Sequence, residues 1–184
     1  MNGKHLKIGW VDIETTGLDP LKNTILEVAI IITDGHLNIL EEAPPVSIWQ
    51  PEEVLVGMDD WCFKHHGDSG LIEECMESDI KMAEADKLLA FFVEEFNNGG
   101  NYNKMPMGGS SVHFDRMFIQ EHMPKLFKAF HYRNIDVSTI YELSRRWYPD
   151  MIADTPTAHR ALDDIRGSIN FMKGYRDTIF VPMK

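Results

Sequence analysis

The sequence has few cysteines and only short apolar runs, and each shortage excludes a class of protein. Two cysteines, Cys62 and Cys75, occur in 184 residues, which supports neither a disulfide framework nor a four-ligand zinc site. Apolar runs such as Val28–Ile32 are far too short to cross a bilayer. The first seven residues, MNGKHLK, resemble neither a secretory signal nor a transit peptide. We therefore expect a cytoplasmic protein with no membrane partner, or a mitochondrial one if a presequence has been removed.

Basic residues are also scarce. The chain has 18 Lys and Arg against 29 Asp and Glu, a net charge of −11. A protein that coats long DNA or RNA through bulk electrostatics needs a basic surface, so that class is excluded. Nucleic acid remains a partner only where metal ions or a few placed cations neutralise its phosphates. Hydrophobic residues make up 43% and charged residues 26%, which is typical of a globular chain and excludes extensive disorder.

The residue pattern changes from strand-like to helix-like at about residue 54. Strands are predicted over residues 7–14, 24–33, 36–40, 46–49 and 105–111, with a hairpin at Asp34-Gly35. Helices are predicted over residues 82–96, 115–122, 137–147 and 157–175. No repeat or linker interrupts the chain, so residues 1–184 are expected to form one domain. The order of elements predicts an α/β fold with a mixed central sheet, antiparallel at its start and flanked by helices.

Two acidic residues, Asp12 and Glu14, end the first predicted strand. Residues i and i+2 of a strand point to one face, about 7 Å apart at the backbone, whereas Val11 and Ile13 point into the core. Two neighbouring carboxylates on an apolar strand repel each other unless a cation lies between them, and a divalent metal ion is the simplest candidate. The alternative is a solvated strand end with two surface acids.

Two later segments each add one acidic candidate. Asp115 follows a stretch of small residues and stands where a helix is expected to begin, so it is either a site residue or a helix N-cap. In the last predicted helix, Asp164 lies about 110° from the centre of the buried stripe, whereas Asp163 lies about 150° away and faces water. Asp164 is therefore the candidate for the edge of a buried site.

His159 precedes Asp164 by five residues, which is about 140° around an ideal helix. The two side chains can share a site only if His159 lies on the first turn or in the preceding loop, an arrangement that Pro156 and Thr157 favour. A surface histidine near a helix start is the alternative.

Asp12, Glu14, Asp115, Asp164 and His159 together make a recognisable chemical set. Carboxylate oxygens suit Mg²⁺ or Mn²⁺. Two such ions about 3.5–4 Å apart clamp the attacking and leaving oxygens of an in-line phosphoryl displacement. A histidine would take the proton of the attacking water, a contribution of about 10²–10⁴-fold.

The stretch 12–18 (DIETTGL), followed by Asp115 and by His159 with Asp164, resembles the DEDDh exonuclease pattern. The resemblance extends to the oligoribonuclease branch over nearly the whole chain. It includes LDP at 18–20, MDDW at 58–61, SGL at 69–71, HYR at 131–133, DVST at 136–139, RRW at 145–147 and ALDDIR at 161–166. It implies a ribonuclease H-like fold, with a sheet that continues in parallel after its antiparallel start.

The resemblance also implies an activity. Members of the branch are homodimeric 3′→5′ exoribonucleases that hydrolyse dinucleotides and very short RNA oligonucleotides to 5′-mononucleotides. By carry-over, two divalent ions, Mg²⁺ or Mn²⁺, would bind in each active site and His159 would be the general base. The implied metal ligands are Asp12, Glu14, Asp115 and Asp164.

Substrate-binding residues follow from the same resemblance. Leu18 would wedge between bases and Trp61 would stack on one, which is worth about 1–3 kcal/mol per base; the alternatives are a turn residue and a core residue. Arg133 would bind the 5′ phosphate through its bidentate guanidinium, or else pair with surface acids. The remaining implied contacts are His66, Ser111, Ser138 and, from the other subunit, Tyr132. The chain departs from the family at Ser110, where Asn is common, at His113 and Phe114, and at Ala158, where Thr is common.

Three functions remain in competition. The leading hypothesis is metal-dependent hydrolysis of short RNA. The second is a proofreading or DNA-trimming exonuclease that acts on longer strands, and the negative charge counts against it because long strands gain affinity from many phosphate contacts. The third is a non-enzymatic nucleotide-binding or dimeric interaction module, which the presence of all five reacting residues disfavours.

Overall fold

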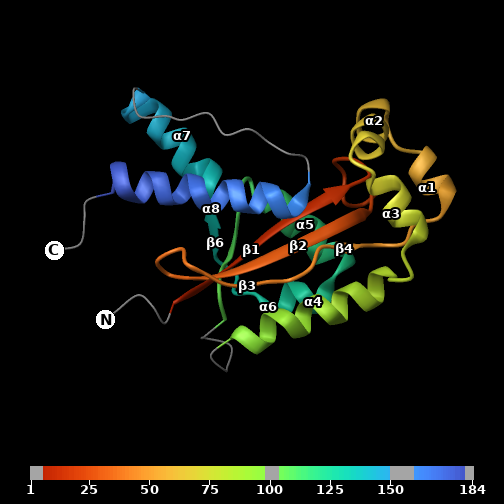
Figure 1. The fold of residues 1–184 in the computed structure, drawn as a ribbon, viewed down its shortest axis with the longest axis horizontal. Helices are drawn as coiled ribbons and strands as arrows, with labels where there is room; N and C mark the ends of the chain where they lie inside the picture. Colours follow the sequence, from red (N-terminus) through yellow and green to blue (C-terminus); the bar gives the residue numbers. More distant parts are fainter. Residues whose placement is uncertain (1–5, 98–103, 150–159, 181–184) are drawn as a thin grey trace.

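A mixed sheet of six strands forms the centre of the molecule. The computed structural model describes residues 6–97, 104–149 and 160–180 (Figure 1). The strands are β1 (Lys7–Thr15), β2 (Ile25–Asp34), β3 (Ile39–Glu42), β4 (Val46–Ser47), β5 (Met107–Gly109) and β6 (Asn134–Asp136). Their order is β3-β2-β1-β5-β6, with β4 beside β2. Pairing is antiparallel between β1 and β2 and parallel from β1 through β5 to β6, which confirms the predicted α/β fold with a mixed sheet.

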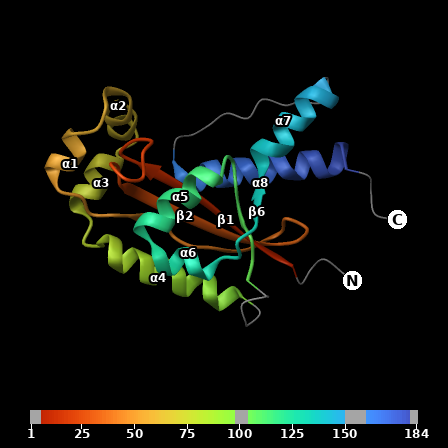
Figure 2. The ribbon, with the colours of Figure 1, turned by 180° about the vertical axis from the view of Figure 1, so that it is seen from behind.

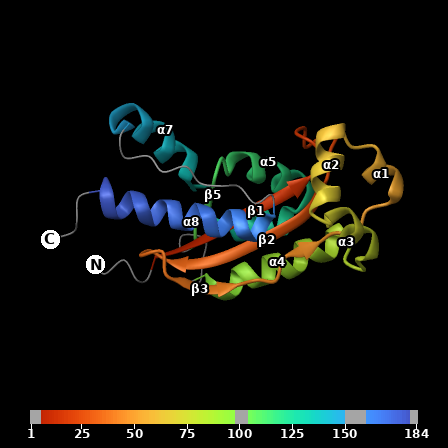
Figure 3. The ribbon, with the colours of Figure 1, turned by 45° about the horizontal axis from the view of Figure 1, so that its top comes forward.

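Helices cover both faces of this sheet (Figures 1 and 2). They are α1 (Glu52–Val56), α2 (Asp60–Asp68), α3 (Leu71–Glu77), α4 (Met82–Phe96), α5 (His113–His122), α6 (Pro124–Ala129), α7 (Val137–Trp147) and α8 (Ala161–Thr178). One face carries α8, which lies across β1 and β2 (Figure 3), and the other face carries α4, α5 and α6. The three short helices α1, α2 and α3 gather at the end of the sheet where β1 ends. None of the helices described is long and apolar enough to span a membrane.

β2 is buried along its whole length because it has neighbours on both faces. Val28, Ile30 and Ile32 pack against α4, α5 and α6, whereas Ala29 and Ile31 pack under α8. A strand covered on both faces is apolar at nearly every position instead of alternating. This explains the dense Ile and Val content, and it confirms the strand predicted over 24–33 to within one residue.

The hairpin after β2 forms at the predicted place but is longer than predicted. The Asp34 carboxylate accepts hydrogen bonds from the backbone N–H groups of His36 (2.8 Å) and Asn38 (3.0 Å). Leu37 adopts a left-handed conformation with φ of 66°. The strand predicted over 36–40 is therefore wrong at its start, because the Asp34 side chain holds residues 35–38 in a loop and β3 begins at Ile39.

Helix predictions succeeded where an apolar stripe is long. Those over 82–96 and 137–147 are confirmed at both ends by α4 and α7. In the described residues α8 begins at Ala161 and continues to Thr178, beyond the predicted end at 175, and residues 157–159 lie outside the described part. The strands predicted over 46–49 and 105–111 are shorter, as β4 and β5. The sequence reading missed α1, α2, α3, α6 and β6, since helices of one or two turns depend on tertiary contacts more than on local pattern.

Asp86 shows how one such short helix is held. This residue of α4 is buried, and its carboxylate accepts hydrogen bonds from the backbone N–H groups of Lys125 (3.0 Å) and Leu126 (2.8 Å). These two groups stand in the first turn of α6, where no intrahelical acceptor exists. The side chain of α4 therefore caps α6 and fixes it against the sheet.

We predict that Asp86→Ala lowers the free energy of unfolding by about 2–3 kcal/mol, because it leaves buried N–H groups at the start of α6 unpaired. Urea denaturation followed by circular dichroism measures the change. Glu95→Ala, which removes an exposed carboxylate from the same helix α4, is the matched control. Equal effects of the two substitutions would contradict the capping role.

Candidate active site

Asp12 and Glu14 lie at the carboxyl end of β1, on the face that α8 covers. Side chains alternate along a strand, and Ile8 and Trp10 precede the two acids on this face. Both are buried in the cluster that includes Ile165 of α8. The intervening residues of β1 are buried in the opposite core, as predicted. The strand therefore delivers two carboxylates directly beneath the start of α8.

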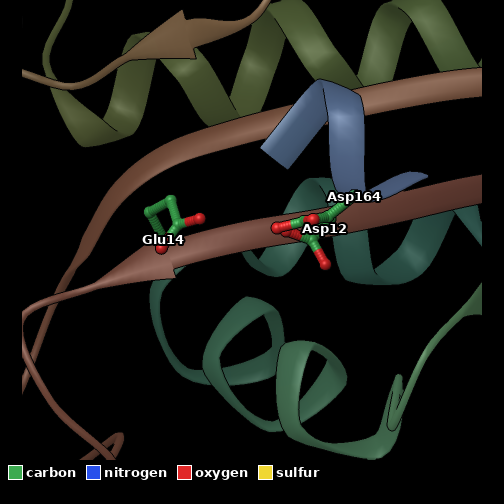
Figure 4. A group of neighbouring side chains, drawn as sticks. All are labelled: Asp12, Glu14 and Asp164. Atoms are coloured by element: carbon green, nitrogen blue, oxygen red, sulfur yellow. The ribbon is translucent and has the colours of Figure 1, made fainter. Parts of the chain in front are cut away.

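Asp164, in the first turn of α8, meets these two residues. Carboxylate oxygens of Asp12, Glu14 and Asp164 all lie within 4.8 Å of one another (Figure 4). Asp163 is exposed instead, and its carboxylate accepts a hydrogen bond from Arg166 Nη1 at 3.1 Å. The structure thus places Asp164, and not Asp163, beside β1, as the helical spacing predicts.

Asp115 approaches the same strand from α5. It is 4% exposed, and its Oδ1 accepts the backbone N–H of Ile13 at 3.1 Å. That N–H lies beyond the pairing of β1 with β5, which covers only Gly9 and Trp10. The helix-cap alternative for Asp115 is wrong, because α5 begins two residues earlier, at His113, with Val112 at its N-cap. Asp115 is therefore held to the backbone of β1 between Asp12 and Glu14.

Burial raises the pKa values of Asp12, Glu14 and Asp115, and the charges of neighbouring acids in the cluster raise those of Asp12 and Glu14 further. Burial raises the pKa of Asp12 well above its ordinary value, and the charges of Asp115 and Glu14 raise it further. Burial, followed by the charge of Asp164, raises the pKa of Glu14 to about 7, although Arg160 opposes the shift. Burial also raises the pKa of Asp115, despite the hydrogen bond from Ile13. Full ionisation of these carboxyl groups is therefore unfavourable at neutral pH when no cation is bound.

The donor set fits a hard divalent cation. All the converging atoms are carboxylate oxygens, which are the ligands of Mg²⁺ and Mn²⁺. A cation among the three carboxylates would also relieve the repulsion that raises the pKa values of Asp12 and Glu14. The three oxygens are close enough together to contact one ion.

Two histidines belong to the predicted site, and they differ in what the structure shows. His159 lies outside the described residues, although the next residue, Arg160, is described. His66 of α2 is 3% exposed; its Nε2 lies 2.9 Å from the Thr15 carbonyl oxygen, and its Nδ1 lies 3.9 Å from Glu14 Oε2. Burial lowers the pKa of His66, so a neutral ring that donates from Nε2 to Thr15 suits this position. His66 is therefore a buried neighbour of Glu14.

Leu18 and Trp61, the two predicted base contacts, are exposed. Leu18 lies in the bend after β1 with 80% of its surface accessible, and Trp61 in α2 with 58%. The Trp61 ring stacks on His65, with ring centroids 3.9 Å apart. The alternative that Trp61 is a core residue is therefore wrong. Leu18 is near the end of β1 because it follows that strand by three residues. Helix α2, which carries Trp61, is held at the same end because its His66 hydrogen-bonds to Thr15.

Ser111 and Ser138, predicted to bind phosphate, are brought together. Their hydroxyl oxygens lie 3.0 Å apart, and the Ser110 hydroxyl lies 3.0 Å from that of Ser138. Asp136 orients both segments, since its Oδ1 accepts the N–H groups of Ser111 (3.0 Å) and Ser138 (2.9 Å). Ser111 is left-handed, with φ of 53°. Ser111 and Ser138 line a hollow of about 420 Å³, together with residues that include His113.

Tyr132 and Arg133 lie just before β6, on the surface. Tyr132 is 75% exposed, and the Arg133 guanidinium stands 5.5 Å from the centre of its ring. Both are therefore accessible to a ligand or to another chain.

Comparisons with known proteins agree with this geometry. The family model described as Exonuclease matches residues 10–172. The oligoribonuclease of Dichelobacter nodosus is 47% identical over 178 residues, which cover 97% of each chain. The human mitochondrial oligoribonuclease is 47% identical over 174 residues, which cover 93% of this chain and 72% of that protein. The chain belongs to the oligoribonuclease family of exonucleases.

Solved structures of exonuclease I share the fold of this oligoribonuclease-family chain. The Methylocaldum szegediense enzyme matches with a TM-score of 0.73 at 19% identity. The zinc-bound form of the E. coli exonuclease I complex with single-stranded DNA matches with 0.71 at 16%. In both comparisons the match covers 95% of this chain and 41% of the other. This chain therefore spans less than half the length of those enzymes.

Sequence reasoning missed two charged residues beside the acid cluster of this oligoribonuclease-family chain. Glu27 of β2 is the cross-strand partner of Glu14, and its charge helps to raise the pKa of Glu14. Arg160 binds Glu27 at 2.7 Å. The sequence feature that could have indicated this pair is the single glutamate inside the apolar run ILEVAIII (25–32), because a buried charge requires a partner.

The raised pKa of Glu14 predicts a pH-dependent effect of Glu14→Gln in the metal-free protein. Glu14 releases its proton near pH 4.5 when unfolded and near pH 7 when folded, so its contribution to stability is complete below pH 4.5 and is lost as the pH rises to 7. In EDTA, Glu14→Gln should therefore raise the free energy of unfolding by about 1–3 kcal/mol at pH 8, and have little effect near pH 4.5.

Urea denaturation at the two pH values measures this difference, with exposed Glu53→Gln as control. An effect of Glu14→Gln that is the same at both pH values would show that Glu14 is not perturbed by its neighbours.

Proposed function

We propose that this protein is a 3′→5′ exoribonuclease that hydrolyses dinucleotides and very short RNA oligonucleotides to 5′-mononucleotides, within one exonuclease domain. The observation that supports it is the convergence of Asp12, Glu14 and Asp164 within 4.8 Å on a chain of the oligoribonuclease family. Relatives that carry the name oligoribonuclease match over nearly the full chain.

Asp12, Glu14 and Asp164 would hold the catalytic cations, with Asp115 completing the set of four ligands. Two ions, Mg²⁺ or Mn²⁺, fit the all-oxygen donors. When bound, the pair would stabilise the negative charge that develops on the attacking and leaving oxygens of the phosphodiester. Asp115 would also hold β1 in place through its bond to the Ile13 N–H.

His159 would act as the general base. It would take a proton from a water molecule whose oxygen attacks the phosphorus of the 3′-terminal phosphodiester. The bond from that phosphorus to the 3′ oxygen of the preceding nucleotide would break, and this oxygen would take up a proton from solvent. The products are a 5′-mononucleotide and an oligonucleotide shortened by one residue. In the sequence, His159 precedes Asp164, which stands in the first turn of α8, by five residues.

Short substrates would be selected by contacts at both ends. Leu18 and Trp61, both exposed near the end of β1, would wedge and stack against the bases, with His66 supporting the same end of the site beside Glu14. The 5′ phosphate would be bound by Ser111, Ser138 and Arg133, and by Tyr132 of the partner subunit in a homodimer. A closed site with few phosphate contacts suits a chain with a net charge of −11.

We place the protein in the cytoplasm. Both cysteines are free and buried in the structure, which suits a reducing compartment. Mouse and human relatives are named mitochondrial, so a mitochondrial location is the alternative.

A series of hydrolysis rates against substrate length tests the proposal. The 5′-phosphorylated substrates run from dinucleotide to about twenty nucleotides, as RNA and as DNA, with Mg²⁺ or Mn²⁺ and with EDTA. We expect kcat/KM to be greatest for RNA dinucleotides and to fall by more than about tenfold for the longest strands, because the site makes few phosphate contacts. EDTA should abolish turnover.

Each other outcome identifies a different error. Rates that rise with length, or that favour DNA, would support the DNA-trimming alternative. Full turnover in EDTA would refute the metal mechanism, and the absence of turnover on every substrate with metal present would refute the enzyme.

A further inference from the structure

Glu27 is a buried glutamate, and both of its carboxylate oxygens accept hydrogen bonds. Its side chain is 1% exposed. Oε2 accepts a hydrogen bond from Arg160 Nη2 at 2.7 Å, and Oε1 accepts the backbone N–H of Ala161 at 3.2 Å. Ala161 is the first residue of α8. A strand side chain thus binds both the side chain and the backbone at the point where this helix begins.

Arg160 ties the same point to a second element. Its guanidinium also binds Glu74 of α3, through Nη1 at 3.0 Å and Nη2 at 2.9 Å, and contacts the Ser69 carbonyl oxygen at 3.3 Å. Burial alone would lower the pKa of Arg160, but the hydrogen bonds with Glu74 and Glu27 raise it. Arg160 therefore remains charged and joins β2, α3 and α8.

Arg160 lies one helical turn before Asp164, which is a predicted metal ligand. The Asp164 N–H donates to the Arg160 carbonyl oxygen at 3.1 Å, which closes the first turn of α8. On the sheet, Glu27 is paired in register with Glu14. The Glu27–Arg160 pair therefore connects α8, which carries Asp164, to β2, which pairs with the strand that carries Asp12 and Glu14.

We propose that Glu27, acting with Arg160, is a positioning residue that fixes Asp164 against Asp12 and Glu14 and so sets the affinity of the acid cluster for divalent cations. The proposal rests on the proposed function, in which this cluster binds metal. Partners that orient the ligands of a metal ion typically change its affinity by about 10–100-fold.

A purely electrostatic effect of Glu27 and Arg160 on cation affinity predicts a different result. Glu27 is negative and lies beside Glu14, so its charge by itself would attract a cation, and the positive charge of Arg160 would repel one. Loss of Glu27 would then weaken cation binding, whereas loss of Arg160 would strengthen it. Positioning requires that loss of either partner weakens binding, because each holds the start of α8.

The test is Mn²⁺ titration of the metal-free full chain, with free Mn²⁺ measured by electron paramagnetic resonance, on Glu27→Gln and Arg160→Gln. Both substitutions remove one charge. Glu27→Gln keeps the size of the side chain, whereas Arg160→Gln shortens it and removes the guanidinium group. Glu42→Gln is the matched control, because Glu42 of β3 forms the same kind of ion pair with Arg166 of α8, at 2.6 Å, farther along that helix.

We expect both Glu27→Gln and Arg160→Gln to raise the Kd for Mn²⁺ by about tenfold or more, and Glu42→Gln to change it less than twofold. Thermal unfolding in EDTA confirms that each variant is folded, and if Glu27→Gln does not fold, Arg160→Gln alone decides. Dinucleotide hydrolysis by the variants should recover when Mn²⁺ is raised to saturation.

Tighter or unchanged Mn²⁺ binding by Arg160→Gln would overturn positioning and leave charge as the explanation. Failure of the unsubstituted protein to bind Mn²⁺ would instead overturn the metal site of the proposed function, which distinguishes the two failures.

Discussion

The carboxylates of Asp12, Glu14, Asp115 and Asp164 repel one another near the end of β1, and the proposed function depends on that repulsion. Burial raises the pKa values of Asp12, Glu14 and Asp115, and the charges of neighbouring acids oppose the ionisation of Asp12 and Glu14 further. Such a cluster costs stability in the metal-free chain. A divalent cation would be attracted by the same group of negative charges and would favour their ionised form. These properties support the proposal that the acid cluster binds divalent cations.

Three features of the fold hold the acids in place. The strand alternation of β1 points Asp12 and Glu14 toward α8. The short β5 pairs with β1 only at Gly9 and Trp10, which leaves the Ile13 N–H to Asp115. The Glu27–Arg160 pair ties the beginning of α8 to β2. The four acids thus come from three elements, β1, α5 and α8, and their convergence depends on the tertiary structure.

The surroundings of the acids match the proposed choice of substrate. Exposed Leu18 and Trp61 stand near one end of the site, and the clustered hydroxyls of Ser111 and Ser138 form another polar point on the surface. Stacking and a few hydrogen bonds can hold a short oligonucleotide without a basic groove. A chain with a net charge of −11 has little to offer a long polyanion.

Much of this arrangement could be predicted from the sequence, and the failures have physical causes. The strand period placed Asp12 and Glu14 on one face, and the helix period separated Asp164 from Asp163. Local pattern could not decide whether Asp115 caps a helix, because its partner Ile13 is 102 residues away. Nor could it find α1, α2, α3 and α6, which are too short to be stable alone, or the bond from Glu27 to Arg160 across 133 residues.

A crystal grown with Mn²⁺ and measured for anomalous scattering tests the central claim most directly. The account predicts two anomalous peaks about 3.5–4 Å apart, bounded by carboxylate oxygens of Asp12, Glu14 and Asp164. A crystal in which these side chains point to separate surfaces, with no peak among them, would contradict it.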